Sequence, residues 1–226
     1  MNRVHVICEG QTEEMFVKEV LYQHFFKMDM VLIPTLIGKP GRKGGYFKFD
    51  RLYENLEIRL LGDLSSYCTI FFDFYGLPND FPGKNLVTSG MTIDQKAHCI
   101  KFQLVDELKK KLGSDPLSRF VPYIQMFEFE GLLFSDPQVF SRSVSEPSLQ
   151  AKIMEIRNQF ESPEHINDSP EDAPSKRILK HFPAYEKPFH GNLAAIDMGI
   201  DVLRRECRLF DQWVSALEAL AREKRP

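Results

Sequence analysis

The chain has 226 residues with a formal net charge of -3, and 43% of them are hydrophobic. This length and composition fit one large domain with a sizeable core and exclude a disordered chain. The charge gives no overall argument for nucleic-acid binding, which would depend on a local basic patch. Four scattered cysteines without a Cys-x-x-Cys pair indicate reduced thiols, and no apolar run approaches the roughly 20 residues of a membrane span. Acidic residues also stand where a signal peptide would need an apolar stretch, so we expect a cytoplasmic protein.

The first part of the chain alternates between strand and helix patterns. A β-branched run from Arg3 to Cys8 ends at Glu9-Gly10, and a helical segment follows from Thr12 to about Lys27. A second strand is expected at residues 31–37, and a helix at 50–61. This order predicts a strand, tight turn and helix unit followed by another strand.

The middle of the chain adds two strand candidates. The apolar run at 68–72 has strand length and ends at an acid, which predicts a central parallel strand buried on both faces. The loop at 76–92 is rich in glycine and proline, and long loops of compact domains are often functional. We expect Asp94 to cap the next helix and a further strand to occupy residues 120–127.

Only helical patterns follow the last strand candidate. We therefore predict an α/β fold, a mostly parallel sheet flanked by helices, with a helical C-terminal region. The expected parts are a core at residues 1–136 and a helical region at 137–226, packed together as one compact unit. The last helix should bury Phe210, Trp213 and Leu217.

Acidic residues follow three of the predicted strands. Glu9, Asp73, Glu128 and Glu130 all fall at strand ends, where ligands bind in parallel α/β sheets. Magnesium prefers oxygen ligands and keeps several waters, so a few carboxylates in one cleft would suffice. With 32 Asp and Glu in the chain, these residues could equally be solvated acids that cap strands and helices. Spacing alone leaves both interpretations open.

Several segments resemble known families. The run Cys8-Glu9-Gly10-Gln11-Thr12-Glu13-Glu14-Met15-Phe16 resembles the opening motif of Toprim domains of the OLD (overcoming lysogenization defect) nuclease type. Residues 72–78, 128–134 and 174–177 resemble a bacterial Toprim-like family of unknown function numbered 4276, and this resemblance covers nearly the whole length. It implies a core that binds Mg²⁺ or Mn²⁺ and hydrolyses phosphodiester bonds of nucleic acid, with a role in defence against phage or mobile DNA.

The resemblance also implies roles for individual acids. Glu9 matches the Toprim glutamate after the first strand, Glu13 the second acid of that motif, and Asp73 the first aspartate of the Asp-x-Asp pattern. Glu130 resembles a later acid that helps to hold a second ion. The implied metal ligands are Glu9, Glu13, Asp73, Glu128 and Glu130, and Glu9 and Asp73 are also implied to be catalytic.

One position departs from the Toprim pattern. Tyr75 stands where the second aspartate would be, so one ligand is missing or replaced. Asp80, Glu128 or Glu130 could complete the metal sphere. The alternative is a catalytically degenerate effector or partner-binding module that works beside an operon-encoded ATPase. The sequence does not fix the oligomeric state, and an oligomer is compatible with it.

Basic residues complete the predicted site. Lys176 lies in a family-like segment and is our first choice for a catalytic cation, and Lys187 is the second, with a solvated surface charge as the ordinary interpretation of each. The glycine-rich loop at 38–48 lacks the order of a P-loop but could hold phosphates through its cations. The residues predicted to bind nucleic acid are Lys39, Arg42, Lys43 and Lys187.

Overall fold

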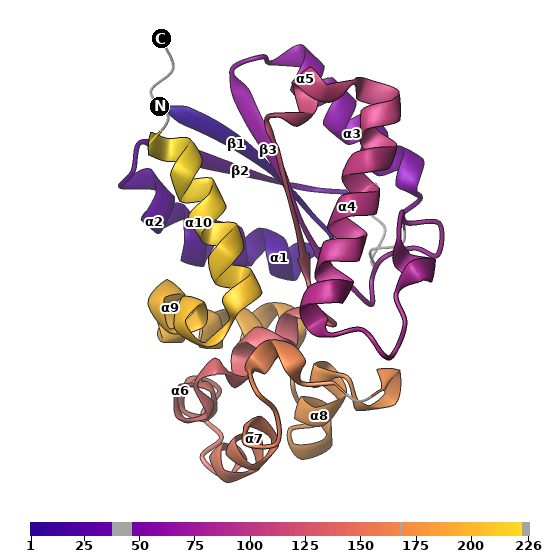
Figure 1. Ribbon diagram of the computed structural model, residues 1–226. Helices are drawn as coiled ribbons and strands as arrows, with labels where there is room; N and C mark the ends of the chain where they lie inside the picture. Colours follow the sequence, from indigo (N-terminus) through magenta and orange to yellow (C-terminus); the bar gives the residue numbers. More distant parts are fainter. Residues whose placement is uncertain (38–46, 168, 223–226) are drawn as a thin grey trace.

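The computed structural model describes residues 1–37, 47–167 and 169–222. At its centre is a parallel sheet with the strand order β2-β1-β3-β4 (Figure 1). The strands are β1 (Asn2–Cys8), β2 (Met30–Leu36), β3 (Ser66–Asp73) and β4 (Phe120–Gln125). The predicted α/β class is confirmed.

The strand β3 is buried at every position and pairs with β1 and β4, so the predicted central parallel strand is confirmed. Because all strands run in the same direction, their carboxyl ends share one edge of the sheet. In the register, Cys8 lies opposite Phe71, and Asp73 lies opposite Gln125. The strand β4 ends two residues before the predicted boundary, since Phe127 adopts a left-handed backbone with φ 65°.

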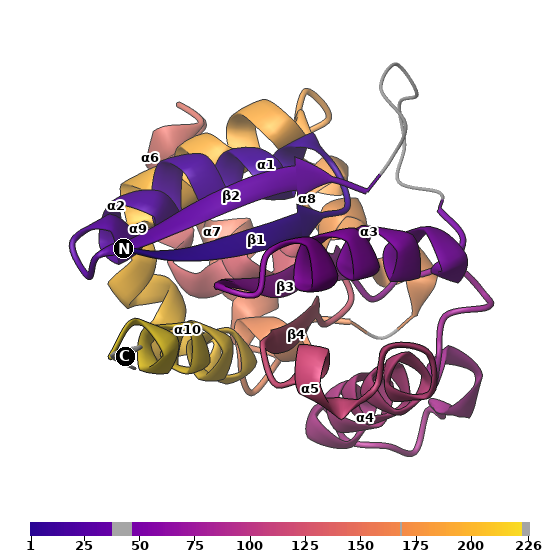
Figure 2. The same cartoon turned by 90° about the horizontal axis from the view of Figure 1, so that it is seen from above.

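Side chains of β3 alternate between two hydrophobic clusters, as the pleat of a strand requires. Tyr67 and Phe71 belong to the cluster shared with the N-terminal and C-terminal helices. Cys68, Ile70 and Phe72 belong to the cluster on the other face. That face is covered by α3 (Phe49–Gly62) and α4 (Ile93–Leu112), and both helices lie against the sheet in Figure 2. Asp73 therefore points to the same face as Phe71.

The predicted N-terminal helix is one helical run of three parts, α1 (Gln11–Phe16), the π-helix η1 (Val17–Leu21) and α2 (Tyr22–Phe26). The predicted cap of α4 was wrong. Thr92 is the N-cap, since its Oγ1 accepts from Gln95 N at 3.3 Å while Gln95 Oε1 accepts from Thr92 N at 2.8 Å. Thr-x-x-Gln is a capping box, which satisfies two backbone donors reciprocally, whereas Asp94 lies one residue inside the helix.

The remaining elements are mostly helical. They are η2 (Lys84–Leu86), α5 (Ser114–Leu117), η3 (Phe129–Ser135), α6 (Pro137–Ser143), α7 (Leu149–Arg157), η4 (Pro163–His165), η5 (Pro170–Asp172), α8 (Pro174–His181), the π-helix η6 (Lys187–Gly191), α9 (Asn192–Glu206) and α10 (Arg208–Arg222). Within the described part of the chain, no helix is long and apolar enough to cross a membrane.

The helix α10 joins the C-terminal region to the sheet. Trp213 stacks on Tyr123 of β4 with ring centroids 4.4 Å apart, and its Nε1 donates to Thr69 Oγ1 of β3 at 2.9 Å. Phe210, Trp213 and Leu217 are buried, as predicted. The C-terminal helices and one face of the sheet thus share a single hydrophobic cluster.

Candidate functional site

Four carboxylates meet at the carboxyl edge of the sheet around one lysine. We call Glu9, Glu13, Asp73 and Glu130 the acid cluster. Lys187 Nζ lies 2.8 Å from Asp73 Oδ2, 3.2 Å from Glu130 Oε2 and 3.7 Å from Glu13 Oε1. Glu9 joins through the backbone, since its Oε2 accepts from Asp73 N at 3.0 Å. The structure thus brings together four of the five acids that the sequence resemblance assigned to a metal site.

The turn between β1 and α1 positions the first two acids. Glu13 Oε2 accepts from Gly10 N at 2.9 Å, so this side chain caps the start of its own helix. The other oxygen, Oε1, is the one that faces Lys187. Glu13 therefore has one oxygen committed to folding and one directed into the acid cluster.

Two helical turns, one buried and one largely at the surface, carry the other two partners. Glu130 lies in η3, whose residues are all buried, and Lys187 opens the π-helix η6. Asn192 fixes this π-helix against α1, because its Nδ2 donates to Thr12 O at 3.2 Å and to Pro188 O at 2.9 Å. The side chain of Lys187 is 33% exposed and those of Glu13, Asp73 and Glu130 at most 6%. Lys187 is therefore the solvent-facing member of the group.

Burial and repulsion from neighbouring carboxylates raise the pKa values of the three glutamates of the cluster. Burial, with Asp73 and Glu13 nearby, raises the pKa of Glu9 to about 8, and burial beside Asp73 raises the pKa of Glu13 to about 7. Burial also raises the pKa of Glu130 to about 7, although Lys187 opposes this shift. For Lys187, burial lowers the pKa, but the carboxylates outweigh it and raise its pKa well above the usual value. The lysine therefore stays charged at neutral pH, where the raised pKa values of the three glutamates favour protonation of these side chains.

Two buried carboxylate oxygens of the cluster accept no hydrogen bond from the described residues. Asp73 Oδ1 is buried without a partner, and Glu130 Oε2 meets Lys187 only as an ion pair. Tyr185 Oη and Asn192 Oδ1 are likewise buried without hydrogen bonds. A buried polar atom left unpaired costs about 1–3 kcal/mol, and such atoms are typical of sites for an ion or a water molecule.

The donor set suits a hard divalent cation, because Mg²⁺ and Mn²⁺ prefer carboxylate oxygens. As the side chains stand, however, no three acidic, His or Cys residues among those described form a group that could hold a metal ion. The ammonium group of Lys187 lies among the carboxylates instead. The chemistry of the acid cluster fits a metal, whereas ion binding would require its side chains to rearrange.

Glu128 is used differently from the acid cluster. Its Oε2 accepts from Ser175 N at 2.9 Å, in the first turn of α8. An acid at a helix N-terminus satisfies a backbone donor and complements the helix dipole. The fifth predicted metal ligand is thus engaged in holding α8 against the segment that leads to Glu130.

The predicted cations and substitute ligands are dispersed. Lys176 is exposed on α8 and makes no contact with the acid cluster among the interactions of the described residues, while Lys187 lies beside the carboxylates. Tyr75 Oη donates to Asn167 Oδ1 at 2.8 Å. Asp80 is exposed and lines a different pocket, with Gln103. The predicted nucleic-acid contacts Lys39, Arg42 and Lys43 lie outside the described residues.

Sequence reasoning missed Lys84, which is close to the cluster. Its ammonium donates to Leu77 O and lies 5.9 Å from the centroid of the Phe74 ring. Burial lowers the pKa of Lys84, and the nearby Glu9 carboxylate opposes that shift. Its position in a long glycine-proline loop gave no local signal, because only the folded loop returns it to the strand ends.

Comparison with known proteins gives three findings. The C-terminal region of the Xanthomonas campestris pv. campestris OLD protein can be superimposed with a TM-score of 0.42 and 12% sequence identity, covering 99% of each chain. No curated protein matches this chain in sequence. The family model described as domain of unknown function DUF4276 matches residues 8–218, nearly the whole length. The chain therefore belongs to the DUF4276 family.

Proposed function

We propose that this protein is a metal-dependent phosphodiester hydrolase that cleaves nucleic acid. The observation that carries the proposal is the meeting of four carboxylates at the strand ends, three of them buried, with the Asp73 Oδ1 atom unpaired. A polar network with unpaired oxygens is expensive to fold, so it indicates a bound ion or water. Defence against phage or mobile DNA is the cellular role that we attach to this proposal, from the sequence resemblance alone.

Each residue of the site has a proposed role that follows from its position and charge. Asp73, Glu130 and Glu13 would hold Mg²⁺ or Mn²⁺. When bound, such an ion would activate water and neutralise the charge that develops on the phosphodiester in the transition state. Glu9, with a pKa of about 8, can take up a proton near neutral pH, as a general base must. Lys187 is solvent-facing and cationic, so it can pair with a phosphate oxygen of the substrate.

The test is cleavage of labelled single-stranded and duplex DNA and RNA with Mg²⁺, Mn²⁺ or EDTA. We expect metal-dependent cutting by the wild type and a loss of about 100-fold in Asp73→Asn and Glu130→Gln. Asp80→Asn is the matched control, because Asp80 is an exposed acid in the loop that follows β3. Absence of cutting, cutting in EDTA, or full activity in Asp73→Asn would contradict the proposal.

A second candidate function has its own support. Tyr75 is bonded to Asn167 where the Toprim pattern has its second aspartate, and Lys187 already compensates part of the negative charge. A scaffold without a working metal site could serve as a partner-binding module, beside an ATPase encoded in the same operon. Titration calorimetry with Mn²⁺ separates the candidates. Saturable binding that is lost in Asp73→Asn favours the hydrolase, whereas no binding, together with co-purification of the ATPase, favours the module.

A further inference from the structure

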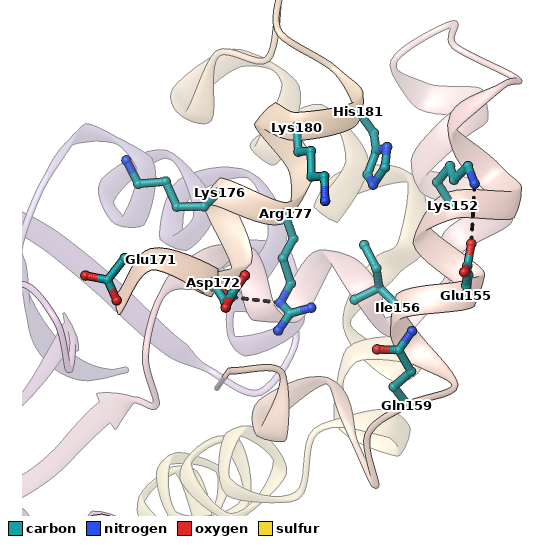
Figure 3. Close-up of a pocket in the computed structure, with 10 residues that line it drawn as sticks. All are labelled: Lys152, Glu155, Ile156, Gln159, Glu171, Asp172, Lys176, Arg177, Lys180 and His181. Carbon is teal, nitrogen blue, oxygen red and sulfur yellow. Dashed lines mark hydrogen bonds and ion pairs between the residues drawn. The ribbon is translucent and has the colours of Figure 1, made fainter. Parts of the chain in front are cut away.

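A polar pocket of about 420 Å³ lies between α7 and α8, and none of its lining residues belongs to the acid cluster (Figure 3). Five of the lining side chains are basic, namely Lys152, Lys176, Arg177, Lys180 and His181. We infer that this α7–α8 pocket binds a phosphate group, either of a nucleic-acid strand or of a free nucleotide. The inference goes beyond the proposed hydrolase, because binding here needs no metal ion and no contact with the acid cluster.

The basic side chains of α8 converge on one part of the pocket. In Figure 3, Arg177, Lys180 and His181 extend from α8 toward the space bordered by Ile156 and Gln159, whereas Lys176 points away. Residues three and four apart share one face of a helix, which accounts for Arg177, Lys180 and His181 lying together. Two helices thus enclose a concave surface with several hydrogen-bond donors.

Two of these basic side chains have no partner among the described residues. Within the described part of the chain, the side chains of Lys180 and His181 form no hydrogen bond or ion pair. Arg177 is held in place, since its Nε donates to Asp172 O at 2.7 Å and its guanidinium lies 5.1 Å from the centroid of the Phe160 ring. A guanidinium held in place next to the uncommitted ammonium of Lys180 offers several hydrogen-bond donors to a phosphate.

Three acidic residues also line the pocket, Glu155, Glu171 and Asp172, and Oδ2 of Asp172 accepts from Ser169 Oγ at 3.4 Å. Glu155 pairs with Lys152 of the same helix at 3.5 Å. Glu171 lies in Figure 3 on the Lys176 side, away from Lys180. The basic side chains of α8 suit one phosphate group, because guanidinium and ammonium groups form charge-assisted hydrogen bonds with its oxygens. The volume is within the range of small-ligand pockets, so a mononucleotide would fit.

A hydrogen bond links the helix that lines the pocket to the segment that carries Glu130. Ser175 N, in the first turn of α8, donates to Glu128 Oε2, and Glu128 precedes the buried turn that carries Glu130. A phosphate bound by the last turn of α8 is therefore held on a helix that is anchored to the neighbourhood of the carboxylates. Glu128 therefore has a structural role outside the acid cluster, since it holds the first turn of α8.

Binding without metal tests the inference. Fluorescence anisotropy would follow a short fluorescein-labelled single-stranded oligonucleotide, and in a second arm a fluorescently labelled adenine nucleotide, both in EDTA. Lys180→Glu reverses one unpaired charge of the pocket, and Lys180→Arg preserves it. Lys109→Glu is the matched control, because Lys109 is also an exposed lysine in the last turn of a helix. Unfolding midpoints of all variants would be compared.

We expect Lys180→Glu to weaken binding about tenfold or more, and Lys180→Arg and Lys109→Glu to bind like the wild type. Binding of the oligonucleotide, with a salt dependence that decreases by about one charge in Lys180→Glu, identifies a strand phosphate. Binding of the nucleotide alone identifies a free nucleotide. If neither probe binds the wild type, or Lys180→Glu binds both equally well, the inference is wrong. Metal-dependent cleavage is measured separately, so either proposal can fail without the other.

Discussion

Gly76 leaves the space in which the carboxylate of Glu9 lies. A Cβ atom at position 76 would come within 2.1 Å of Glu9 Oε1 and 2.3 Å of Glu9 Oε2, far closer than nonbonded atoms approach. The same carboxylate accepts from the backbone of Asp73, three residues earlier in the chain. The turn after β3 is therefore shaped around the side chain that follows β1, and its glycine is needed for close approach.

Replacement of this glycine should destabilise the protein. We expect Gly76→Ala to lower the free energy of unfolding by about 1–3 kcal/mol, because the carboxylate of Glu9 would have to shift and leave the backbone N–H of Asp73 without its acceptor. Urea denaturation measures this loss. Gly90→Ala is the control, because a Cβ atom there meets nothing within 4 Å.

A double variant separates the proposed clash from a general effect on the loop. Glu9→Ala removes the carboxylate that a Cβ at position 76 would meet, so Gly76→Ala should cost little in that background. An equal loss in both backgrounds would show that Gly76 serves the backbone of the turn, independent of Glu9.

Stability without metal should decrease as the pH rises. The folded-state pKa of Glu9 is about 8, against an ordinary value of 4.5, so the folded protein binds the proton more tightly than the unfolded chain. The contribution of this proton to the free energy of unfolding is fully present below pH 4.5 and is lost as the pH rises through about 8. In EDTA, we expect Glu9→Gln to remove roughly 1–3 kcal/mol of this pH dependence, and Glu54→Gln, at an exposed site on α3, to remove none. Denaturation curves at several pH values decide between these outcomes, and parallel profiles for wild type and Glu9→Gln would refute the assignment.

Glu164 caps the helix α10 directly, although it lies about 45 residues earlier in the chain. Its two carboxylate oxygens accept from Leu209 N and Phe210 N, each at 2.9 Å, at the first turn of that helix. An amide can accept only one of these bonds, so Glu164→Gln should lower the free energy of unfolding by about 1–2 kcal/mol. Glu161→Gln, at a side chain 84% exposed, should have little effect in the same thermal unfolding experiment. Equal melting temperatures for the two variants would count against this capping role.

Much of the fold was predictable because the sequence encodes it locally. The continuous apolar run of β3 and the spacing of Phe210, Trp213 and Leu217 each reflect burial in one element. Boundaries were harder, since they depend on single residues. Phe127 ends the last strand through its backbone conformation, and Thr92 rather than Asp94 caps α4 through a reciprocal pair of hydrogen bonds.

The site was only partly predictable. The topology predicts that the strand ends meet, but it does not predict which partner each side chain at those ends contacts. Parallel strands imply that Glu9 and Asp73 end at the same edge. Nothing local distinguishes Glu130, which faces Lys187, from Glu128, which caps α8. The choice between Lys176 and Lys187 likewise depends on how the C-terminal helices pack against the sheet.

Removal of Lys187 should make the protein depend on a divalent cation. Lys187→Met leaves Asp73, Glu130 and Glu13 without their shared counter-charge, and we expect a loss of roughly 1–3 kcal/mol in EDTA, between the values for exposed and buried ion pairs. Because Mn²⁺ can replace the missing charge, its addition should raise the melting temperature of Lys187→Met more than that of the wild type. Lys109→Met, at an exposed site, is the control and should respond to Mn²⁺ like the wild type. If Mn²⁺ shifts Lys187→Met no more than the control, the acid cluster does not exchange its lysine for a metal ion.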